Sequence, residues 1–362
     1  MNEALMRAVA VLSTLVLLGL GYPASTVTWH DNRVPAGRMM AGALMLDLEI
    51  ARGTWYPNGE RRAGTNVLAF RERGHGLTTP GPLVRVRLGT RISVSIANTS
   101  TDTVTVHGLG SRQGAAVFDS LLVLPGVTVT TSFVADAEGT FFYWGARPGT
   151  RLMSRGFDDA LLSGALIVDP AQGPIPEDRI LMIDVLEELV PSASGPVPSP
   201  GTLAINGRPW PLTERLEATV GDSIRWRVIN RSSRSHPMHL HGFYFRVDAA
   251  GDWQRDTVFD ARQQRMAVTE GLAVGSTLDL VWSPDRPGGW LFHCHLSFHA
   301  MMNPPVGDDW KGYDAFFARA FRDLGNADAA NHVEHHMAGL ILVTNVVPKA
   351  GEAYPALRPV AR

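Results

Sequence analysis

Two short stretches, HPMHLHG at 236–242 and HCHLSFH at 293–299, decide how the rest of the chain is interpreted. Together they hold six of the twelve histidines and the only cysteine among 362 residues. A cysteine thiolate with imidazoles is a soft ligand set, and one Cys with two His forms the equatorial ligand set of a blue-copper site. The concentration of these residues therefore indicates a copper centre.

The order of residues in the two stretches divides the ligands into two groups, because neighbouring side chains on a β-strand point to opposite faces. Cys294 faces one way, and its two neighbouring histidines face the other. His236 lies an odd number of residues from the other two histidines of its stretch, so it falls on the opposite face. Alternation does not place His299, because the strand can end before it. The pattern predicts one site with Cys294 and His236, and a second site that collects His239, His241, His293 and His295.

Bulk properties agree with a packed protein of two domains. The length exceeds that of one small sandwich. Hydrophobic residues make up 45% and charged residues 19%, and the 36 glycines and 24 prolines favour short strands joined by turns. The net charge of −2 gives no argument for nucleic acid as a partner or for an anionic membrane surface.

The N-terminal segment resembles a secretory signal. A short polar start, MNEALMR, precedes the apolar stretch AVAVLSTLVLLGLGY and then small residues. That apolar stretch is short for a membrane span, which needs about 20 residues. We therefore expect a signal peptide over 1–25, an irregular linker over 26–41, and an exported protein, periplasmic or extracellular. A single cysteine forms no internal disulfide, so Cys294 is either a buried thiol or a metal ligand.

Strand-like runs fall into two sets, and alternating polar and apolar residues between Gly, Asn and Asp indicate an antiparallel sandwich for each. The two sets share a local order of motifs, which favours two copies of one Greek-key fold. We predict an all-β chain with an N-terminal cupredoxin-like domain over 42–172 and a C-terminal one over 178–348. The runs of the first set are 43–55, 82–100, 103–109, 127–145 and 161–170. Those of the second are 180–189, 203–210, 216–232, 238–248, 277–284, 289–295 and 338–346.

One segment departs from the strand pattern. Residues 301–333 form an insertion before the last strand, and YDAFFARAFRDLG within it has apolar residues at helical spacing. Gly325 is a plausible end for that helix. Residues 349–362 are expected to form a tail.

The pairing and order of the two C-terminal motifs resemble the third and fourth copper motifs of laccase-like multicopper oxidases. The resemblance covers essentially residues 42–348. It implies that His236, Cys294 and His299 bind a type 1 copper that accepts electrons from a substrate. It also implies that electrons pass through Cys294, His293 and His295, as the catalytic residues, to a three-copper cluster that reduces dioxygen. Half of that cluster would be held by His239, His241, His293 and His295.

The other half of the cluster departs from the family pattern. In TVHGL, Thr105 replaces the first expected ligand and His107 keeps the second. In YWGA, Trp144 and Ala146 stand in place of both histidines, and neither can bind copper. Five of the eight expected cluster histidines remain, which predicts a reduced site of one or two coppers at His107 and the four C-terminal histidines.

The resemblance also bears on the axial position of the type 1 copper. By register, Leu340 occupies it, and Met337 is the alternative as the thioether of that segment. A leucine that does not coordinate tends to raise the potential of the copper.

Two-domain relatives share their cluster between subunits, so we expect a homotrimer in which His107 reaches a neighbour's histidines. The expected partners are a small-molecule or metal-ion reductant and dioxygen. Two other interpretations stay open. One is a two-copper enzyme like nitrite reductase, and the other is an electron-transfer or copper-binding cupredoxin without oxidase turnover.

Overall fold

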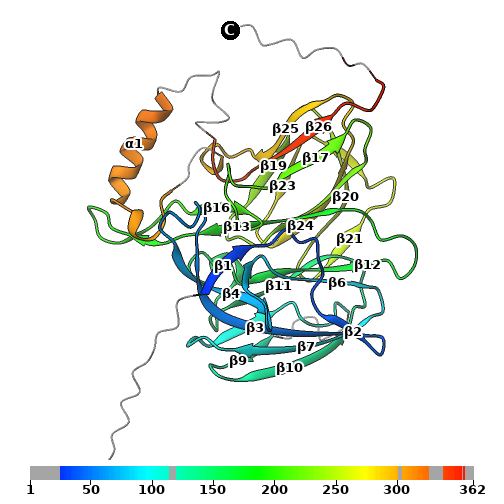
Figure 1. Cartoon of the computed structure of the whole chain (residues 1–362), viewed down its shortest axis with the longest axis horizontal. Coiled ribbons are helices and arrows are strands. Elements are labelled where there is room, and N and C mark those ends of the chain that lie inside the picture. Colours follow the sequence, from blue (N-terminus) through cyan, green and yellow to red (C-terminus); the bar gives the residue numbers. More distant parts are fainter. Residues whose placement is uncertain (1–24, 114–119, 301–303, 326–336, 353, 355–362) are drawn as a thin grey trace, which may run out of the picture.

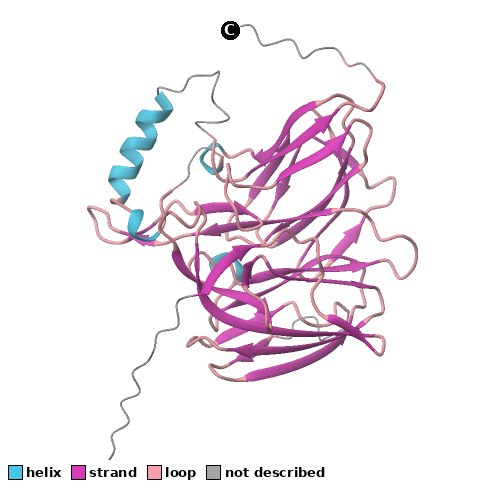
Figure 2. Ribbon diagram, in the orientation of Figure 1, coloured by secondary structure: helices cyan, strands magenta, loops and turns pink. Residues whose placement is uncertain are grey.

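The computed structural model describes residues 25–113, 120–300, 304–325, 337–352 and 354. It contains two β-sandwiches, one on top of the other (Figure 1). Strands dominate, and one longer helix stands to the side (Figure 2). This confirms the predicted all-β class with two cupredoxin-like domains. Most of the predicted signal peptide lies outside the described residues.

The first sandwich has an outer and an inner sheet. The strands of the outer sheet are β1 (Ser25–Trp29), β5 (Leu77–Thr79), β4 (Thr65–Glu72), β3 (Ala43–Trp55), β7 (Arg91–Asn98) and β10 (Thr128–Val134), with β2 (Arg38–Met40) paired to β3. Those of the inner sheet are β6 (Gly81–Arg87), β12 (Ser163–Asp169), β11 (Gly139–Ala146), β8 (Val104–His107) and β9 (Leu121–Val123).

The second sandwich repeats this plan in reverse order, with its inner sheet facing the first domain. The inner sheet contains β16 (Thr202–Ile205), β13 (Arg179–Leu186), β18 (Ile224–Asn230), β24 (Ser276–Trp282), β20 (Phe245–Asp252), β21 (Asp256–Val258) and β22 (Arg265–Ala267). The outer sheet contains β17 (Arg215–Thr219), β26 (Ile341–Val347), β25 (Gly288–Cys294), β19 (His236–Leu240) and β23 (Thr269–Leu272), and a separate hairpin joins β14 (Leu189–Val190) to β15 (Val197–Pro198).

The sheets are mixed rather than purely antiparallel. β3 pairs with β7 in parallel, β6 with β12, β13 with β18, and β17 with β26. The expectation of antiparallel sandwiches is therefore wrong in detail. Alternation reports which face of a strand is buried but not the direction of its neighbour, and Greek-key connections bring distant strands together.

The segment predicted as a linker, 26–41, also needs correction. β1 pairs in parallel with both β3 and β5, and β2 pairs with β3. Val27 is buried and its neighbours in β1 are exposed, which agrees with a short alternation of polar and apolar residues in the sequence. The partners of β1 are not its neighbours in the sequence, since Ser25 lies opposite Gly53 of β3 and Val27 lies opposite Leu77 of β5, and no local pattern reveals such pairing. Sequence reasoning also missed β4. Four consecutive residues of this strand are buried, so it lacks the alternation of polar and apolar residues that predicts a strand.

The four sheets stack in four layers, because a separate hydrophobic cluster lies between each neighbouring pair. One fills the first sandwich and one fills the second. A third joins Phe142, Trp144 and Ala146 of β11 to Ile180 and Met182 of β13. The two inner sheets are thus buried on both faces, and such strands read as continuous apolar runs. This arrangement leaves the outer face of the second domain's outer sheet as an end face of the stack.

Buried charges join the two domains. Arg231 is fully buried, forms an ion pair with Asp184, and donates to the carbonyl oxygens of Leu161 (2.8 Å) and Ser163 (3.1 Å) across the interface. Burial raises the pKa of Asp184 to about 6. Since an unpaired buried charge is costly, these contacts hold the domains in one relative orientation.

The predicted helix is α1 (Tyr313–Gly325), which confirms the helical insertion, and the residues that follow Gly325 lie outside the described part of the chain. Its first turn contacts the β14–β15 loop, where Tyr313 N–H donates to the Pro191 oxygen and Asp314 accepts from Ala193 N–H. Residues 301–303 and 326–333 of the insertion, and most of the predicted tail, lie outside the described residues. Short 3-10 turns occur at Leu152–Ser154, Ser297–His299 and Gly307–Asp309. Within the described part of the chain, no helix is both long and apolar enough to cross a membrane.

Candidate metal centre

Adjacent strands bring the two histidine motifs together. β19 and β25 run antiparallel, with Met238 opposite Cys294 and His239 opposite His293. Because both strands alternate, one face of this pair turns into the core of the second sandwich and the other turns out to the end face of the stack. Cys294 and His236 lie on the inward face, and both are fully buried.

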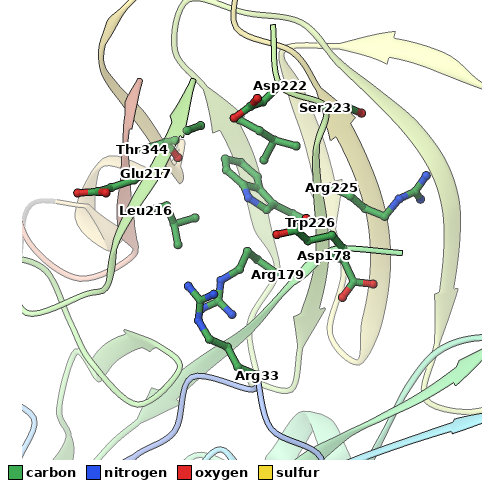
Figure 3. Close-up of a pocket in the computed structure, with 13 residues that line it drawn as sticks. Arg33, Asp178, Arg179, Leu216, Glu217, Asp222, Ser223, Arg225, Trp226 and Thr344 are labelled. Carbon is green, nitrogen blue, oxygen red and sulfur yellow. The ribbon is translucent and has the colours of Figure 1, made fainter. Parts of the chain in front are cut away.

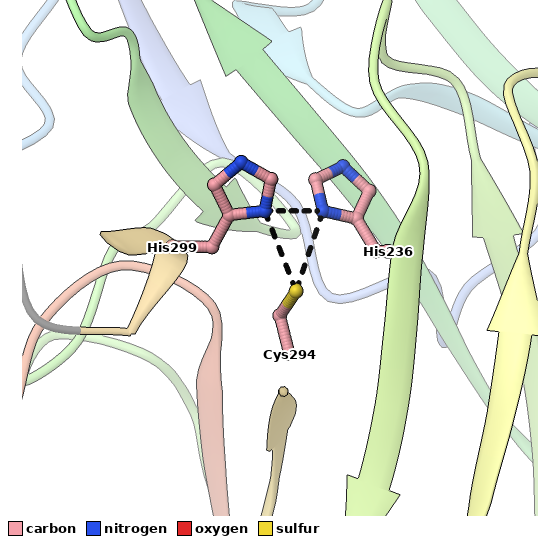
Figure 4. A group of neighbouring side chains, drawn as sticks. All are labelled: His236, Cys294 and His299. Carbon is pink, nitrogen blue, oxygen red and sulfur yellow. Dashed lines mark hydrogen bonds between the residues drawn. The ribbon is translucent and has the colours of Figure 1, made fainter. Parts of the chain in front are cut away.

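The inward group consists of His236, Cys294 and His299 (Figure 4). The Cys294 Sγ atom lies 3.7 Å from His236 Nδ1 and 3.4 Å from His299 Nδ1, and the two Nδ1 atoms are 3.1 Å apart. The 3-10 turn Ser297–His299 directly after β25 brings His299 into this group, which alternation could not do.

This triangle fits a single copper ion. A metal about 2 Å from each of three ligand atoms holds those atoms about 3.5 Å apart, and two His with one Cys in a trigonal arrangement is the blue-copper ligand set. Burial lowers the pKa of His236 to about 3 and that of His299 to about 4, so both imidazoles are neutral, as a ligand must be. Burial raises the pKa of the Cys294 thiol to about 11, and metal binding would have to displace its proton.

Leu340 and Met337, the two candidates for the axial position, lie in different hydrophobic clusters. Leu340 is fully buried in the same cluster as Cys294, and its carbonyl oxygen accepts from the Cys294 N–H at 3.1 Å. Met337 packs instead against the cluster of Trp210, Leu291 and Val343. Since Leu291 and Val343 point away from Cys294 on their strands, Met337 is associated with the opposite side of the sheet, and Leu340 is the better axial candidate.

The outward group gathers the other four histidines on the end face of the stack. Ligand nitrogens of His239, His241 and His293 all lie within 4.8 Å of one another, and the Nε2 atoms of His241 and His293 are 2.9 Å apart. The ring of His295 is 5.1 Å from that of His239 and 6.0 Å from that of His293. The predicted division into two groups is therefore also the spatial one.

Hydrogen-bond contacts of the Nδ1 atoms orient two of these rings. The Nδ1 atom of His239 lies 2.8 Å from Thr269 Oγ1, and that of His293 lies 2.8 Å from the Cys294 oxygen. In both rings Nδ1 is thus held by a neighbouring oxygen, which leaves Nε2 as the nitrogen for a metal, and that of His293 faces His241 Nε2 at 2.9 Å. Burial lowers the pKa of His293 to about 4 and lowers that of His239 and His241 as well. Imidazoles kept neutral on an open face are suited to copper with room for a further ligand.

The first-domain residues occupy a different layer of the structure. Trp144 lies opposite His107, and Ala146 lies opposite Thr105, so the four positions expected to bear ligands do come together. Trp144 and Ala146 face the second domain of the same chain, in the cluster between the inner sheets. The outward histidines lie about two sheet spacings away, which is roughly 20 Å. Within one chain, the structure does not bring His107 to the other histidines.

Aromatic and cationic groups fill the space around His107. Its ring stacks on Trp144 at 4.1 Å and meets the edge of Trp253 at 6.1 Å. The Arg155 guanidinium lies 5.4 Å from the Trp144 ring. Burial and the charge of Arg155 lower the pKa of His107. Sequence reasoning missed Trp253, because it lies in the other domain and only folding brings it here.

Two cavities border the outer sheet of the second domain, and one of them is lined by a candidate ligand. One, of about 470 Å³, opens beside His241 between Trp210 and Trp290. The other, of about 410 Å³, lies between β17, β18 and β26, with Trp226 at its centre (Figure 3). Trp226 contacts Phe292, two residues before Cys294, with ring centroids 4.8 Å apart. No predicted ligand lines this second cavity.

Comparison with known proteins supports the family. Two multicopper oxidase family models match the chain, one over residues 75–172, within the first sandwich, and the other over residues 188–303, mainly within the second. A probable nitrite reductase-hydroxylamine oxidoreductase fusion protein of Kuenenia stuttgartiensis is 27% identical over 263 residues, which is 65% of this chain and 28% of that protein. Multicopper oxidase MmcO of Mycobacterium tuberculosis is 31% identical over 117 residues, or 30% of this chain and 21% of that protein.

A solved structure shares the fold over most of its length. The blue copper oxidase of Nitrosomonas europaea superposes with a TM-score of 0.59 at 22% identity, covering 83% of this chain and 85% of that one. The chain spans less than a third of the length of the two curated relatives above. The chain belongs to the multicopper oxidase family, and its His and Cys groups make copper the implied cofactor.

Proposed function

We propose that the chain is a laccase-like copper oxidoreductase. In this proposal His236, Cys294 and His299 hold a type 1 copper, with Leu340 at the axial position, and His239, His241, His293 and His295 hold further copper at which dioxygen is reduced. The observation that carries the proposal is Cys294, which lies in the buried triangle while its two neighbours lie in the outward group. When bound, copper would supply one-electron redox chemistry.

The protein's own part in this reaction is to connect two environments. Cys294 is held in an apolar core, where the side chains of Met238, Leu240 and Leu340 exclude water. The backbone on either side of Cys294 leads to His293 and His295 on the outer face, which is open to solvent. A short covalent path therefore joins a site for a reductant's electrons to a site for an acceptor.

The direct test is copper stoichiometry and an optical spectrum of copper-loaded protein, for the native chain and for Cys294→Ser. We expect an intense blue absorption that disappears in the variant, because the copper–thiolate bond is its source. Oxygen uptake with a phenolic or metal-ion reductant then tests turnover. Blue protein without oxygen uptake would contradict the oxidase and indicate an electron carrier, whereas protein without copper would contradict both.

A homotrimer and export of the protein are further parts of the proposal. The outward histidines lie on an end face of the stack, and the chain segments next to β19 and β23 carry the exposed apolar side chains of Tyr244, Met266 and Val268, which are 65%, 59% and 39% accessible. Exposed apolar patches of this kind often mark contact surfaces. A neighbour's His107 would complete the site there once it leaves its stack on Trp144. A monomeric mass in solution would contradict the trimer, and the unprocessed N-terminus in a cytoplasmic fraction would contradict export.

A nitrite-reductase-like enzyme is the second candidate. Two observations favour it: the first-domain positions of Trp144 and Ala146 lack ligands, and the Kuenenia stuttgartiensis relative is named for nitrite reduction. The two candidates differ in their acceptor. Nitrite consumption under anaerobic conditions by copper-loaded protein, with no oxygen uptake in air, would replace the oxidase proposal.

A further inference from the structure

The chain builds the same loop twice, once in each domain, and only the second copy contacts a predicted copper ligand. The loops are NTSTD at 98–102 and NRSSR at 230–234, each at the end of a strand of its sandwich. In the first, the Ser100 hydroxyl lies 2.7 Å from Asn98 Oδ1; in the second, the Ser232 hydroxyl lies 2.7 Å from Asn230 Oδ1. Both serines are buried.

The remaining contacts of the two loops also match. Ser100 N–H donates to Asn98 Oδ1 at 3.0 Å, and Asp102 N–H donates to Ser100 Oγ at 3.2 Å. The corresponding distances are 3.0 Å from Ser232 N–H and 3.2 Å from Arg234 N–H. Four residues after the serine, the first copy has buried Val104 and the second has His236. The second copy therefore adds one contact, 2.9 Å between Ser232 Oγ and His236 Nε2.

The protons of this loop can be assigned from groups whose roles are unambiguous. A backbone N–H only donates, so the Asn230 atom that faces Ser232 N–H is its oxygen. The Asn230 amide nitrogen donates to the carbonyl oxygens of Arg234, Leu272 and Ala273, which keeps that orientation. Ser232 Oγ therefore has two oxygen acceptors within reach, Asn230 Oδ1 at 2.7 Å and the Arg234 oxygen at 3.1 Å.

This assignment determines the direction of the bond to His236. A hydroxyl has one proton, and two oxygen atoms 2.7 Å apart need a proton between them. The Ser232 proton is therefore used on Asn230, and its lone pairs face Arg234 N–H and His236. His236 Nε2 must then carry the donor hydrogen. In a neutral ring, the second nitrogen, Nδ1, is left bare, and it is the atom that faces Cys294 and His299.

His299 differs in this respect. Its Nε2 atom is buried and has no hydrogen-bond partner among the residues that the structure describes. No hydrogen bond at Nε2 therefore fixes its tautomer from outside the triangle, as Ser232 does for His236. Of the two imidazoles in the triangle, one is held in a defined tautomer by the loop and the other is not.

We propose that Ser232 is a positioning residue that locks His236 as its Nε2–H tautomer and so presents a bare Nδ1 atom to the copper. The copper part of this proposal rests on the proposed type 1 site, whereas the tautomer is a property of the metal-free protein. The hydroxyl is a weaker acceptor than a carboxylate and gives the imidazole only a modest increase in donor strength. A serine hydroxyl as the acceptor from His236, like a leucine at the axial position, favours a high reduction potential of the copper.

The first test uses the native protein without copper. Two-bond ¹H–¹⁵N correlation spectra of histidine-labelled protein report which ring nitrogen carries the proton. We expect His236 as a single Nε2–H tautomer in the native chain. A Nδ1–H form, or a mixture of both forms, would overturn the proposal whether or not the protein binds copper.

The second test compares Ser232→Ala with Ser100→Ala. Both variants lose the same loop contacts, so they should lose similar thermal stability, but only Ser232→Ala loses the contact to His236. We expect a mixed His236 tautomer and a loss of about 10- to 100-fold in Cu(II) affinity for Ser232→Ala, with a raised reduction potential, and none of these changes for Ser100→Ala. Ser232→Thr retains the hydroxyl and should restore native values.

Equal copper affinity and potential in the two alanine variants would overturn the role of Ser232 at the metal. If Ser232→Ala does not fold, the native tautomer and the Ser232→Thr variant still decide the question. A protein that binds no copper would contradict the proposed function, and the spectra of the metal-free chain would still show whether the loop selects the tautomer.

Discussion

The two sandwiches contain the same strand in the same place but use it differently. β11 in the first domain and β25 in the second each begin at a glycine of unusual backbone conformation, Gly139 with φ 146° and Gly288 with φ 143°. Each is paired to the strand that bears the upstream motif, with Trp144 opposite His107 and His293 opposite His239. Counted from the two glycines, the corresponding positions are Trp144 with His293, Gly145 with Cys294, and Ala146 with His295.

The inward position of the first domain, Gly145, is surrounded by apolar side chains in place of candidate ligands. A Cβ atom added at Gly145 would lie 2.5 Å from a Leu162 methyl and 3.1 Å from a Val104 methyl. Val104 corresponds to His236 by the duplicated loop. Apolar side chains therefore fill the space that the ligand triangle occupies in the second domain. The first sandwich needs no metal around Gly145, since close packing of apolar side chains forms its core there.

The outward position differs because of what lies next to it. In the second domain this face is an end face of the stack, and its histidines are half-buried or exposed. In the first domain it lies against the second domain, and Trp144 is 3% accessible. A buried face favours large apolar side chains and an open face tolerates ligands. The comparison teaches that layer order separates the two outward positions, whereas the two inward positions lie in similar cores and differ by their side chains.

The strongest test of this comparison is to give the second domain the side chain of the first. His236→Val removes one of three ligands and leaves a residue that already packs well at the corresponding site. We expect complete loss of the blue absorption with a native far-ultraviolet circular dichroism spectrum. A variant that keeps the blue band would show that His236 is not a ligand.

The next largest effect concerns the interdomain layer. Trp144→Ala removes a large side chain from the cluster between the inner sheets and should cost about 3–5 kcal/mol of the free energy of unfolding. Chemical denaturation measures this change. Trp29→Ala is the control, because Trp29 is 38% accessible and lies under the Arg208 guanidinium rather than between the two inner sheets, so its loss should cost clearly less than that of Trp144. Equal costs would refute the role of Trp144 in this layer.

A smaller effect is expected where the first domain is filled. Gly145→Ala forces a methyl group against Leu162 and should destabilise the protein by about 1–3 kcal/mol. Gly271→Ala, in β23, is the matched control, because a Cβ atom there meets nothing within 4 Å. If both variants unfold at the same denaturant concentration, the space at Gly145 is not filled as described.

The smallest effect is a pH dependence of the metal-free protein. Burial depresses the pKa of His236 to about 3 and that of His299 to about 4, below the unfolded value of about 6.5. The unfolded chain then binds more protons, so stability is lost as the pH falls below about 6.5. From about pH 7 to about pH 6, the loss should be under about 1 kcal/mol per histidine. His236→Val should show a shallower slope; an identical slope would contradict this origin.

Much of the metal centre could be predicted from the sequence, because the division of ligands depends on a local property. Alternation along one strand separates Cys294 from its neighbours whatever the strand packs against. The helix Tyr313–Gly325 was predictable for the same reason, since its periodicity is a local signal.

Other features depended on partners far away in the chain. β1 has no strong pattern of its own and becomes a strand through β3 and β5. The contact of Ser232 with His236 had one trace in the sequence, the repeated Asn-x-Ser at 98–100 and 230–232, but its meaning requires the proton assignment of the folded loop.

By itself, the sequence determined the fold class and the two groups of candidate ligands, because residue type and strand period are written along the chain, and its resemblance to the family pointed to the missing first-domain ligands. Only the tertiary structure decided that His299 turns back to Cys294, that Leu340 and not Met337 shares its core, and that His107 is stacked away from the other histidines. These outcomes depend on which sheet faces which, and that is set by long-range packing that no local pattern records.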